Sequence, residues 1–247
     1  MRRAVLLYQS TIGKKAVAAV SGVILFLFLV LHVVGNLKVF LGTNSQGVPD
    51  IDLYAHFLRT MGEPMAPYGA ILWLVRAVLL IALILHVTTV VQLAMRNRQA
   101  RPQRYACYRL TQSTVPARAM LGTGLAILAF VVIHLLQFTT GTIDWTPFRE
   151  GAVYANLYHA FHVWYIVLFY LVAMGVIASH LLHGVWSFFQ TLGIDNADRN
   201  RGLRCLATTL AILLLIGFCS LPVCFYLGIL PEPPGNAVVQ AIIDGGA

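Results

Sequence analysis

Hydrophobic residues of this 247-residue chain fall into five long runs that are separated by shorter polar segments. The runs cover residues 16–40, 69–95, 119–140, 158–189 and 206–230. A helix needs about 20 apolar residues to cross about 30 Å of hydrocarbon, and every run is at least that long. We therefore expect an all-α integral membrane protein, a single domain over residues 1–247 with five transmembrane helices.

The segment between the first two runs contains many turn-forming residues, namely Gly42, Gly47, Pro49, Gly62, Pro64 and Pro67. Glycine and proline at this density predict a loop. Residues 54–59 lie between these breakers, and we expect them to form a short helix at the membrane interface.

The positions of the basic residues predict the orientation of the chain in the membrane. Hydrophobic residues make up 59% of the chain and charged residues 11%, which is typical of membrane proteins. Thirteen of the seventeen basic residues lie in three segments: Arg2, Arg3, Lys14 and Lys15; Arg96, Arg98, Arg101, Arg104, Arg109 and Arg118; and Arg199, Arg201 and Arg204. Basic loops stay on the cytoplasmic side. We therefore expect a multi-pass protein of the cell (inner) membrane, with its amino terminus inside and its carboxyl terminus outside, and no nucleic-acid partner.

The four cysteines limit the metal chemistry. Cys107, Cys205, Cys219 and Cys224 form no C-x-x-C pair, and the chain has no C-x-x-C-H motif. Neither a zinc-thiolate site nor a covalently attached haem is therefore expected.

Four of the apolar runs contain a histidine well inside the run: His32, His86, His134 and His180. A polar side chain in hydrocarbon is costly and needs a partner, so each is a candidate functional residue. His32 and His134 lie in the outer halves of outward-going helices, whereas His86 and His180 lie about nine residues before the inner ends of inward-going helices. At 1.5 Å per residue, the two levels differ by roughly 10 to 15 Å.

Each level then offers two imidazoles, which is the ligand set of a six-coordinate electron-transferring haem iron. We interpret the chain as a bundle that encloses two non-covalent haems b, with His32 and His134 binding one and His86 and His180 the other. A mononuclear zinc site fits less well, because it needs three or four ligands at one depth. His183 is an alternative to His180, because residues three apart lie on nearly the same helix face.

A second group of polar residues lies at or near the outer boundary. Their simplest interpretation is solvated or interfacial side chains. The alternative is a quinone pocket or contacts to haem propionates, formed by Arg76, Tyr54, His56, Arg59, Glu63 and Tyr68. Arg76 is the strongest candidate for such a contact, since a charge within a span needs a counter-charge. No catalytic residue is assigned.

Taken together, these residues resemble the single-chain, five-helix cytochrome b subunit of succinate:quinone oxidoreductases and quinol:fumarate reductases. The resemblance runs from Ser10-Thr11-Ile12-Gly13-Lys14-Lys15 to the fifth run. Its most specific parts are the sequence at 32–37, the loop element at 54–58, and the fourth-run motif His180-x-x-x-Gly184-x-Trp186-Ser187-Phe188. The family ligand lies four residues before the glycine, which implies His180 rather than His183.

The resemblance implies a membrane anchor for a flavoprotein subunit and an iron-sulfur subunit on the cytoplasmic side. Electrons would pass between the iron-sulfur subunit and a membrane quinone, menaquinone or ubiquinone, while succinate chemistry would occur on the partner. This would make the chain the quinone-reactive subunit of an enzyme of the respiratory chain and the tricarboxylic acid cycle. One position departs from some fumarate-reducing relatives, which carry glutamate where this chain has Ala178. The resemblance therefore does not extend to their transmembrane proton path.

Other cytochromes and a haem-free protein are the alternatives. A quinol:fumarate reductase subunit has the same architecture with the opposite direction of electron flow. A stand-alone b561-like cytochrome would not need the long basic loop. Cytochrome b of the quinol:cytochrome c complexes places two ligands on one helix about 13 or 14 residues apart, and no run here has two histidines at that spacing. A haem-free transporter would be colourless.

Overall fold

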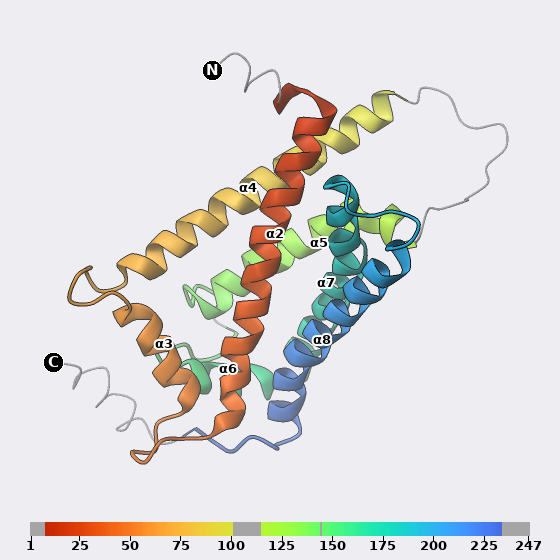
Figure 1. The fold of residues 1–247 in the computed structure, drawn as a ribbon. Coiled ribbons are helices and arrows are strands. Elements are labelled where there is room, and N and C mark those ends of the chain that lie inside the picture. The colour runs from red at the N-terminus through yellow and green to blue at the C-terminus, as the bar shows by residue number, and fades with distance from the viewer. Residues whose placement is uncertain (1–7, 101–114, 144, 234–247) are drawn as a thin grey trace. The chain divides into compact units, whose positions relative to one another are not determined.

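The computed structural model describes residues 8–100, 115–143 and 145–233, and the described part is helical apart from turns and one isolated bridge between Thr43 and Pro49 (Figure 1). In chain order the elements are α2 (Thr11–Asn36), the 3-10 helix η1 (Leu37–Leu41), α3 (Asp50–Thr60), α4 (Ala70–Gln99), α5 (Val115–Phe138), α6 (Val153–Phe161), α7 (Trp164–Thr191) and α8 (Asn200–Tyr226).

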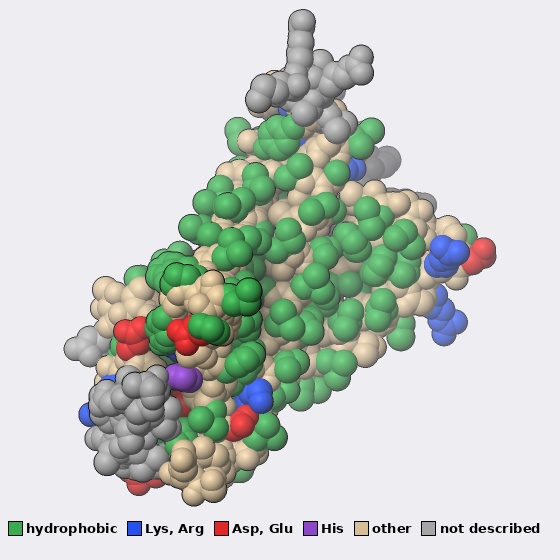
Figure 2. Space-filling view, turned by 60° about the vertical axis from the view of Figure 1, so that its left-hand side comes forward, with side chains coloured by type: hydrophobic (Ala, Val, Ile, Leu, Met, Phe, Trp, Pro, Cys, Tyr) green, Lys and Arg blue, Asp and Glu red, His purple; other side chains and the backbone are tan. Residues whose placement is uncertain are grey.

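Five of these helices are long and apolar enough to cross a membrane, as in a multi-pass membrane protein. The candidate spans are Thr11–Leu41, Ala70–Gln99, Ala117–Phe138, Trp164–Thr191 and Asn200–Tyr226. On the face drawn in Figure 2, hydrophobic side chains cover much of the helical surface and charged side chains are few. The expectation of an all-α chain with five such helices is confirmed.

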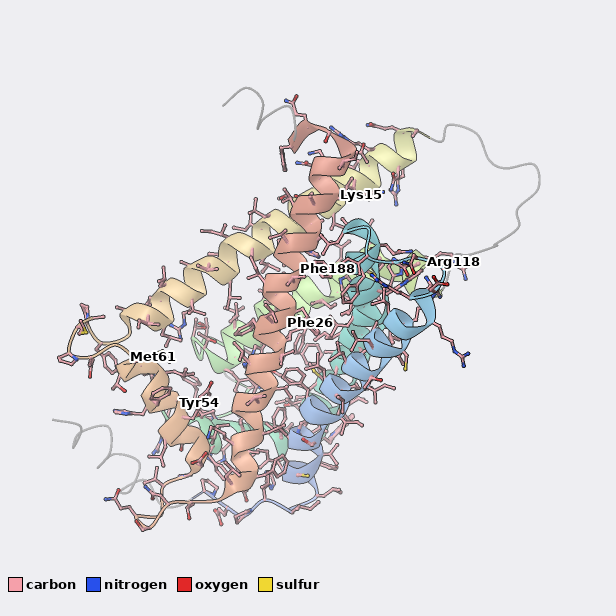
Figure 3. All side chains as sticks on the ribbon, viewed as in Figure 1. Lys15, Phe26, Tyr54, Met61, Arg118 and Phe188 are labelled. Carbon is pink, nitrogen blue, oxygen red and sulfur yellow. The ribbon has the colours of Figure 1, made fainter. Side chains whose placement is uncertain are left out.

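Local capping sets the start of α2, five residues before the expected position. Ser10 precedes the helix, and its hydroxyl oxygen accepts a hydrogen bond from the backbone N–H of Gly13 at 2.9 Å. Such a cap satisfies one of the free N–H groups of the first turn. Lys15 and Phe26, labelled in Figure 3, therefore belong to one continuous helix that ends at Asn36.

The fourth span differs from the expectation, because α7 begins at Trp164 and not at residue 158. Residues 158–161 belong to the separate helix α6, which ends at Phe161. At the break, the His162 ring nitrogen Nδ1 lies 2.7 Å from the carbonyl oxygen of Tyr158. Apolar composition alone does not reveal this interruption, since both helices are hydrophobic.

Glycines end the last two long helices in the same way. Gly193 follows α7 with φ +70° and Gly228 follows α8 with φ +68°, in the left-handed region that other residues rarely adopt. The next N–H groups turn back to the helix: Ile194 donates to Phe189 at 3.0 Å and Ile229 donates to Cys224 at 2.9 Å. This is the Schellman arrangement that satisfies the last free carbonyls.

The chain divides into two compact units, and each long helix contributes to both. Unit 1 comprises Met1–Leu29, Ala77–Ile127 and Val176–Leu213, and unit 2 comprises Val30–Arg76, Leu128–Gly175 and Leu214–Ala247.

Short elements pack together within unit 2. Tyr54 projects from α3 against the end of α2, so closely that a Cβ on Gly35 would lie 2.7 Å from its ring (Figure 3). An ion pair of 3.0 Å joins Lys38 to Asp50 at the start of α3. The short helix expected at 54–59 is present as α3, and it begins four residues earlier, after Pro49.

Candidate functional site: two pairs of histidines

The two units separate the four candidate ligands into two pairs. His86 and His180 belong to unit 1, whereas His32 and His134 belong to unit 2. All four imidazoles are half-buried, so each keeps accessible surface that a bound group could cover. This division gives the same pairs as the depth argument.

In unit 2, the rings of His32 on α2 and His134 on α5 make a T-shaped contact. Their centroids lie 6.0 Å apart and their planes are nearly perpendicular, at 84°. Two imidazoles bound to one metal from opposite sides would have centroids about 6 Å apart, because the metal–nitrogen bond is about 2 Å and the ring centre lies about 1 Å beyond the nitrogen. The centroid separation of this pair therefore matches that expected for two imidazoles bound to one iron.

Aromatic side chains surround this pair. Phe130 stacks on His134 with ring centroids 5.7 Å apart, and Phe138 lies at the same distance. Phe218 on α8 lies 5.8 Å from His32. Such a lining excludes water and offers flat apolar surface, which suits a porphyrin.

In unit 1, His86 on α4 is fixed against α2. Its Nδ1 lies 3.0 Å from the carbonyl oxygen of Ala18 and 3.4 Å from the hydroxyl of Ser21. A Cβ on Gly22 would lie 3.1 Å from Cε1 of the same ring. Gly22 therefore permits the imidazole to approach the helix backbone closely.

His180 on α7 is fixed against α5 in the same manner. Its Nδ1 lies 3.0 Å from the hydroxyl of Thr123, and a Cβ on Gly124 would lie 3.4 Å from its Cε1. The Thr123 hydroxyl also bonds the carbonyl of Ala119 at 3.0 Å, so its proton is engaged there and its lone pair can accept from His180.

Three of the four rings thus have Nδ1 engaged: His86 with a backbone carbonyl, His180 with a threonine hydroxyl, and His134 with the hydroxyl of Tyr170 at 3.3 Å. A histidine that donates Nδ1–H keeps Nε2 free of a proton. Metal-binding histidines are commonly oriented in this way. The donor set therefore fits two six-coordinate haems.

His183 has different surroundings. Its ring lies against Trp186 on its own helix, with centroids 5.7 Å apart, and its Nδ1 is buried with no hydrogen-bond partner among the described residues. Trp186 in turn donates to Asp195 at 3.2 Å, and the Arg204 guanidinium lies 3.8 Å from the Trp186 ring. These contacts join the end of α7 to the start of α8.

Ser21, Thr123, Tyr170 and Gln137 are site residues that the sequence analysis missed. A signal for the first two was present, because a hydroxyl–glycine pair stands ten residues before a histidine in two runs. Ser21-Gly22 precedes His32, and Thr123-Gly124 precedes His134. Tyr170 and Gln137 had no comparable signal.

The candidate quinone or propionate contacts all lie in unit 2 but are not joined to one another. The Arg76 guanidinium lies 4.8 Å from the ring of Trp73, Arg59 donates to the carbonyl of Ala55 at 2.9 Å, and Tyr54 stacks on Phe57. Glu63 and Tyr68 are exposed and His56 is half-buried. No hydrogen bond or ion pair connects these six residues to one another in the part of the chain that the structure describes.

Part of the basic surface is also described. Lys14 is buried, hydrogen-bonded to Gln92, and lies 4.1 Å from the ring of Tyr8. Arg96 donates to the backbone of Gln9 at 2.8 Å. Five other basic residues and one cysteine lie outside the described residues: Arg2, Arg3, Arg101, Arg104, Arg109 and Cys107.

Comparison with protein-family models, with curated proteins and with solved structures finds no match.

Proposed function

We propose that this chain is the membrane-anchor cytochrome b subunit of a succinate:quinone oxidoreductase, with two haems b. The observation that carries the proposal is the close pair His32 and His134, whose centroid separation of 6.0 Å suits one shared iron. In the other unit, His86 and His180 each have Nδ1 at 3.0 Å from an oxygen of the neighbouring helix.

Each residue has a role in holding a haem. His32, His134, His86 and His180 would bind iron through Nε2, while Nδ1 donors orient three of these rings. His180 is favoured over His183, because its ring is anchored across to the neighbouring helix α5.

Bound haem b would supply a one-electron redox couple. The protein would orient the haem ligands, exclude water from them and leave space for their rings. Phe130, Phe138 and Phe218 cover the rings of His32 and His134 from water. Gly22 and Gly124 make space for the rings of His86 and His180.

The subunit would work in a complex. We expect the flavoprotein and iron-sulfur subunits to dock at the basic, cytoplasmic end, and dicarboxylate chemistry to occur there. Menaquinone or ubiquinone would react within the membrane, with Arg76, Tyr54 and neighbouring side chains as candidate contacts. The carboxyl terminus would lie outside.

Haem content of the purified subunit tests the proposal. We expect two haems per chain and a b-type reduced-minus-oxidised spectrum. Replacing one ligand, as in His134→Ala or His180→Ala, should leave one haem, whereas His183→Ala should retain two. A colourless wild-type protein, or loss of haem from His183→Ala alone, would refute the assignment.

Electron donors then distinguish the oxidoreductase from its alternatives. Succinate should reduce the haems in membranes that contain the whole complex, and purified subunit alone should not respond. Reduction by ascorbate but not by succinate would instead favour a b561-like cytochrome. Oxidation of quinol by fumarate, faster than the reverse reaction, would favour the fumarate reductase.

A further inference from the structure

The hydroxyl of Tyr170 lies between two residues of α5, inside unit 2. It donates a hydrogen bond to Oε1 of Gln137 at 2.9 Å, and it lies 3.3 Å from Nδ1 of His134. Gln137 and His134 are three residues apart on one helix face, and Tyr170 reaches both from α7. The three side chains therefore form one continuous relay.

The single proton of the Tyr170 hydroxyl determines which groups donate and which accept in this chain of hydrogen bonds. A tyrosine hydroxyl has one proton, and here Gln137 accepts it. The oxygen can then meet His134 only with a lone pair, so His134 must donate Nδ1–H. Its Nε2 is then unprotonated and able to bind a metal.

The relay is rigid and dry. Tyr170 is 6% exposed and Gln137 is 4% exposed, so water does not compete for their hydrogen bonds. The Tyr170 ring makes T-shaped contacts with Phe130, Phe138 and Phe161 at centroid distances of 5.3, 5.8 and 5.2 Å. The hydroxyl is thus held in place by the packing of its ring.

The other pair shows the same direction of donation with different acceptors. His86 donates to a backbone carbonyl, which no side-chain substitution removes, and His180 donates to Thr123. At His134 the acceptor is a phenol polarised by its own donation to Gln137. His134 is therefore the ligand whose orientation depends on two further side chains.

We propose that Tyr170 and Gln137 are positioning residues that fix the tautomer of His134 and set the reduction potential of the haem bound by His32 and His134. This inference rests on the proposed function. An acceptor at Nδ1–H stabilises the more positively charged, oxidised state of the bound metal. Removal of the acceptor should therefore raise the potential of that haem and leave the other unchanged.

Tyr170→Phe is the direct test, because it removes one oxygen and keeps the ring packing. A potentiometric titration of the purified holo-complex should show one haem shifted upward. Loss of one such hydrogen bond is expected to change the reduction equilibrium about tenfold, which is about 59 mV for a one-electron couple. The shifted haem should be the one that is missing from His134→Ala.

Tyr165→Phe is the matched control, since it removes a hydroxyl from an exposed tyrosine of the same helix. Its potentials should equal those of the wild type. Gln137→Met provides a second variant, in which Tyr170 remains but its proton has no acceptor; it should shift the same haem upward by less than Tyr170→Phe.

The outcomes separate this inference from the proposed function. Two haems with unchanged potentials in both Tyr170→Phe and Gln137→Met would overturn the relay and leave the haem assignment standing. A downward shift, or a shift of the other haem, would also overturn it. A wild-type protein without haem would overturn both.

Discussion

Asp52 on α3 is a buried carboxylate outside the membrane-spanning helices. It is 7% exposed, and its Oδ1 accepts a hydrogen bond from the backbone N–H of Tyr154 at 2.9 Å. Its Oδ2 is buried and has no hydrogen-bond partner among the described residues. Burial raises the pKa of Asp52 to about 6, against backbone hydrogen bonds from Tyr154 and Val153 and the charge of Arg59, which lower it.

This raised pKa makes the free energy of unfolding depend on pH. Between the ordinary value of 3.8 and about 6, the folded state binds the proton more tightly than the unfolded state. The stabilisation is therefore complete below pH 3.8 and is lost as the pH rises through about 6. The difference of about 2 pH units corresponds to about 3 kcal/mol.

Asp52→Asn tests this reasoning. The amide keeps the Oδ1 acceptor for Tyr154 and carries no charge, but its NH₂ group would be buried without a partner, which costs about 1–3 kcal/mol. At pH 7.5 we expect a net gain of up to about 2 kcal/mol, or up to roughly 4–8 °C in Tm for a chain of this size. Thermal unfolding in detergent from pH 4 to pH 8 measures both the gain and the pH dependence.

The pH dependence of Tm tests the role of Asp52 more directly than the gain in Tm at a single pH. Asp52→Asn should remove the fall in Tm from pH 4 to pH 6.5, whereas Asp50→Asn, on the same turn but paired with half-buried Lys38, should retain it. An unaltered fall in the Asp52→Asn variant would show that this carboxyl does not carry the effect. A lower Tm at every pH would show that the unpaired amide costs more than the buried charge.

Three further substitutions test contacts between helices. Gly217→Ala places a Cβ 2.6 Å from Val33 Cγ2, and we expect a loss of about 1–3 kcal/mol in thermal unfolding. Gly22→Ala places a Cβ 3.1 Å from the His86 ring, and we expect weaker retention of one haem during purification, measured as haem per chain. Trp186→Phe removes the indole donor to the turn after α7, and we expect a loss of about 1 kcal/mol.

Each substitution has a matched control. Val33→Ala combined with Gly217→Ala should recover part of the lost stability, because the clashing methyl is gone. Gly175→Ala meets no atom within 4 Å and should retain both haems. Trp164→Phe, at an indole that is 62% exposed, should leave Tm unchanged. Equal losses in test and control would contradict the contacts named here.

The long helices could be predicted from the sequence because their signal is local and strong. An uninterrupted apolar run predicts a membrane-crossing helix whatever its neighbours are. The helix ends were harder to predict. The start of α2 depends on the Ser10 cap, and the break between α6 and α7 falls inside a hydrophobic stretch. Neither feature changes the apolar pattern.

The candidate histidines could be predicted from the sequence, whereas their hydrogen-bond partners could not. A histidine within an apolar run can be recognised in the sequence, so His32 and His134 could be named as candidates from their positions alone. Tyr170 and Gln137 are ordinary residues until α5 and α7 pack, because their role depends on a contact between residues 33 positions apart. Only a structure brings such partners together.

The repeated hydroxyl–glycine pair indicates how the two proposed haem sites are related. α2 carries Ser21-Gly22 ten residues before His32, and α5 carries Thr123-Gly124 ten residues before His134. Each of these helices thus holds the histidine of its partner, α4 or α7, at one level and offers its own histidine about 15 Å further along. The pairs α2–α4 and α5–α7 therefore repeat one arrangement, and each proposed haem takes one ligand from each pair. Haem binding would then join two helix pairs that make similar internal contacts, so loss of either haem should loosen the association between the pairs more than the structure within them.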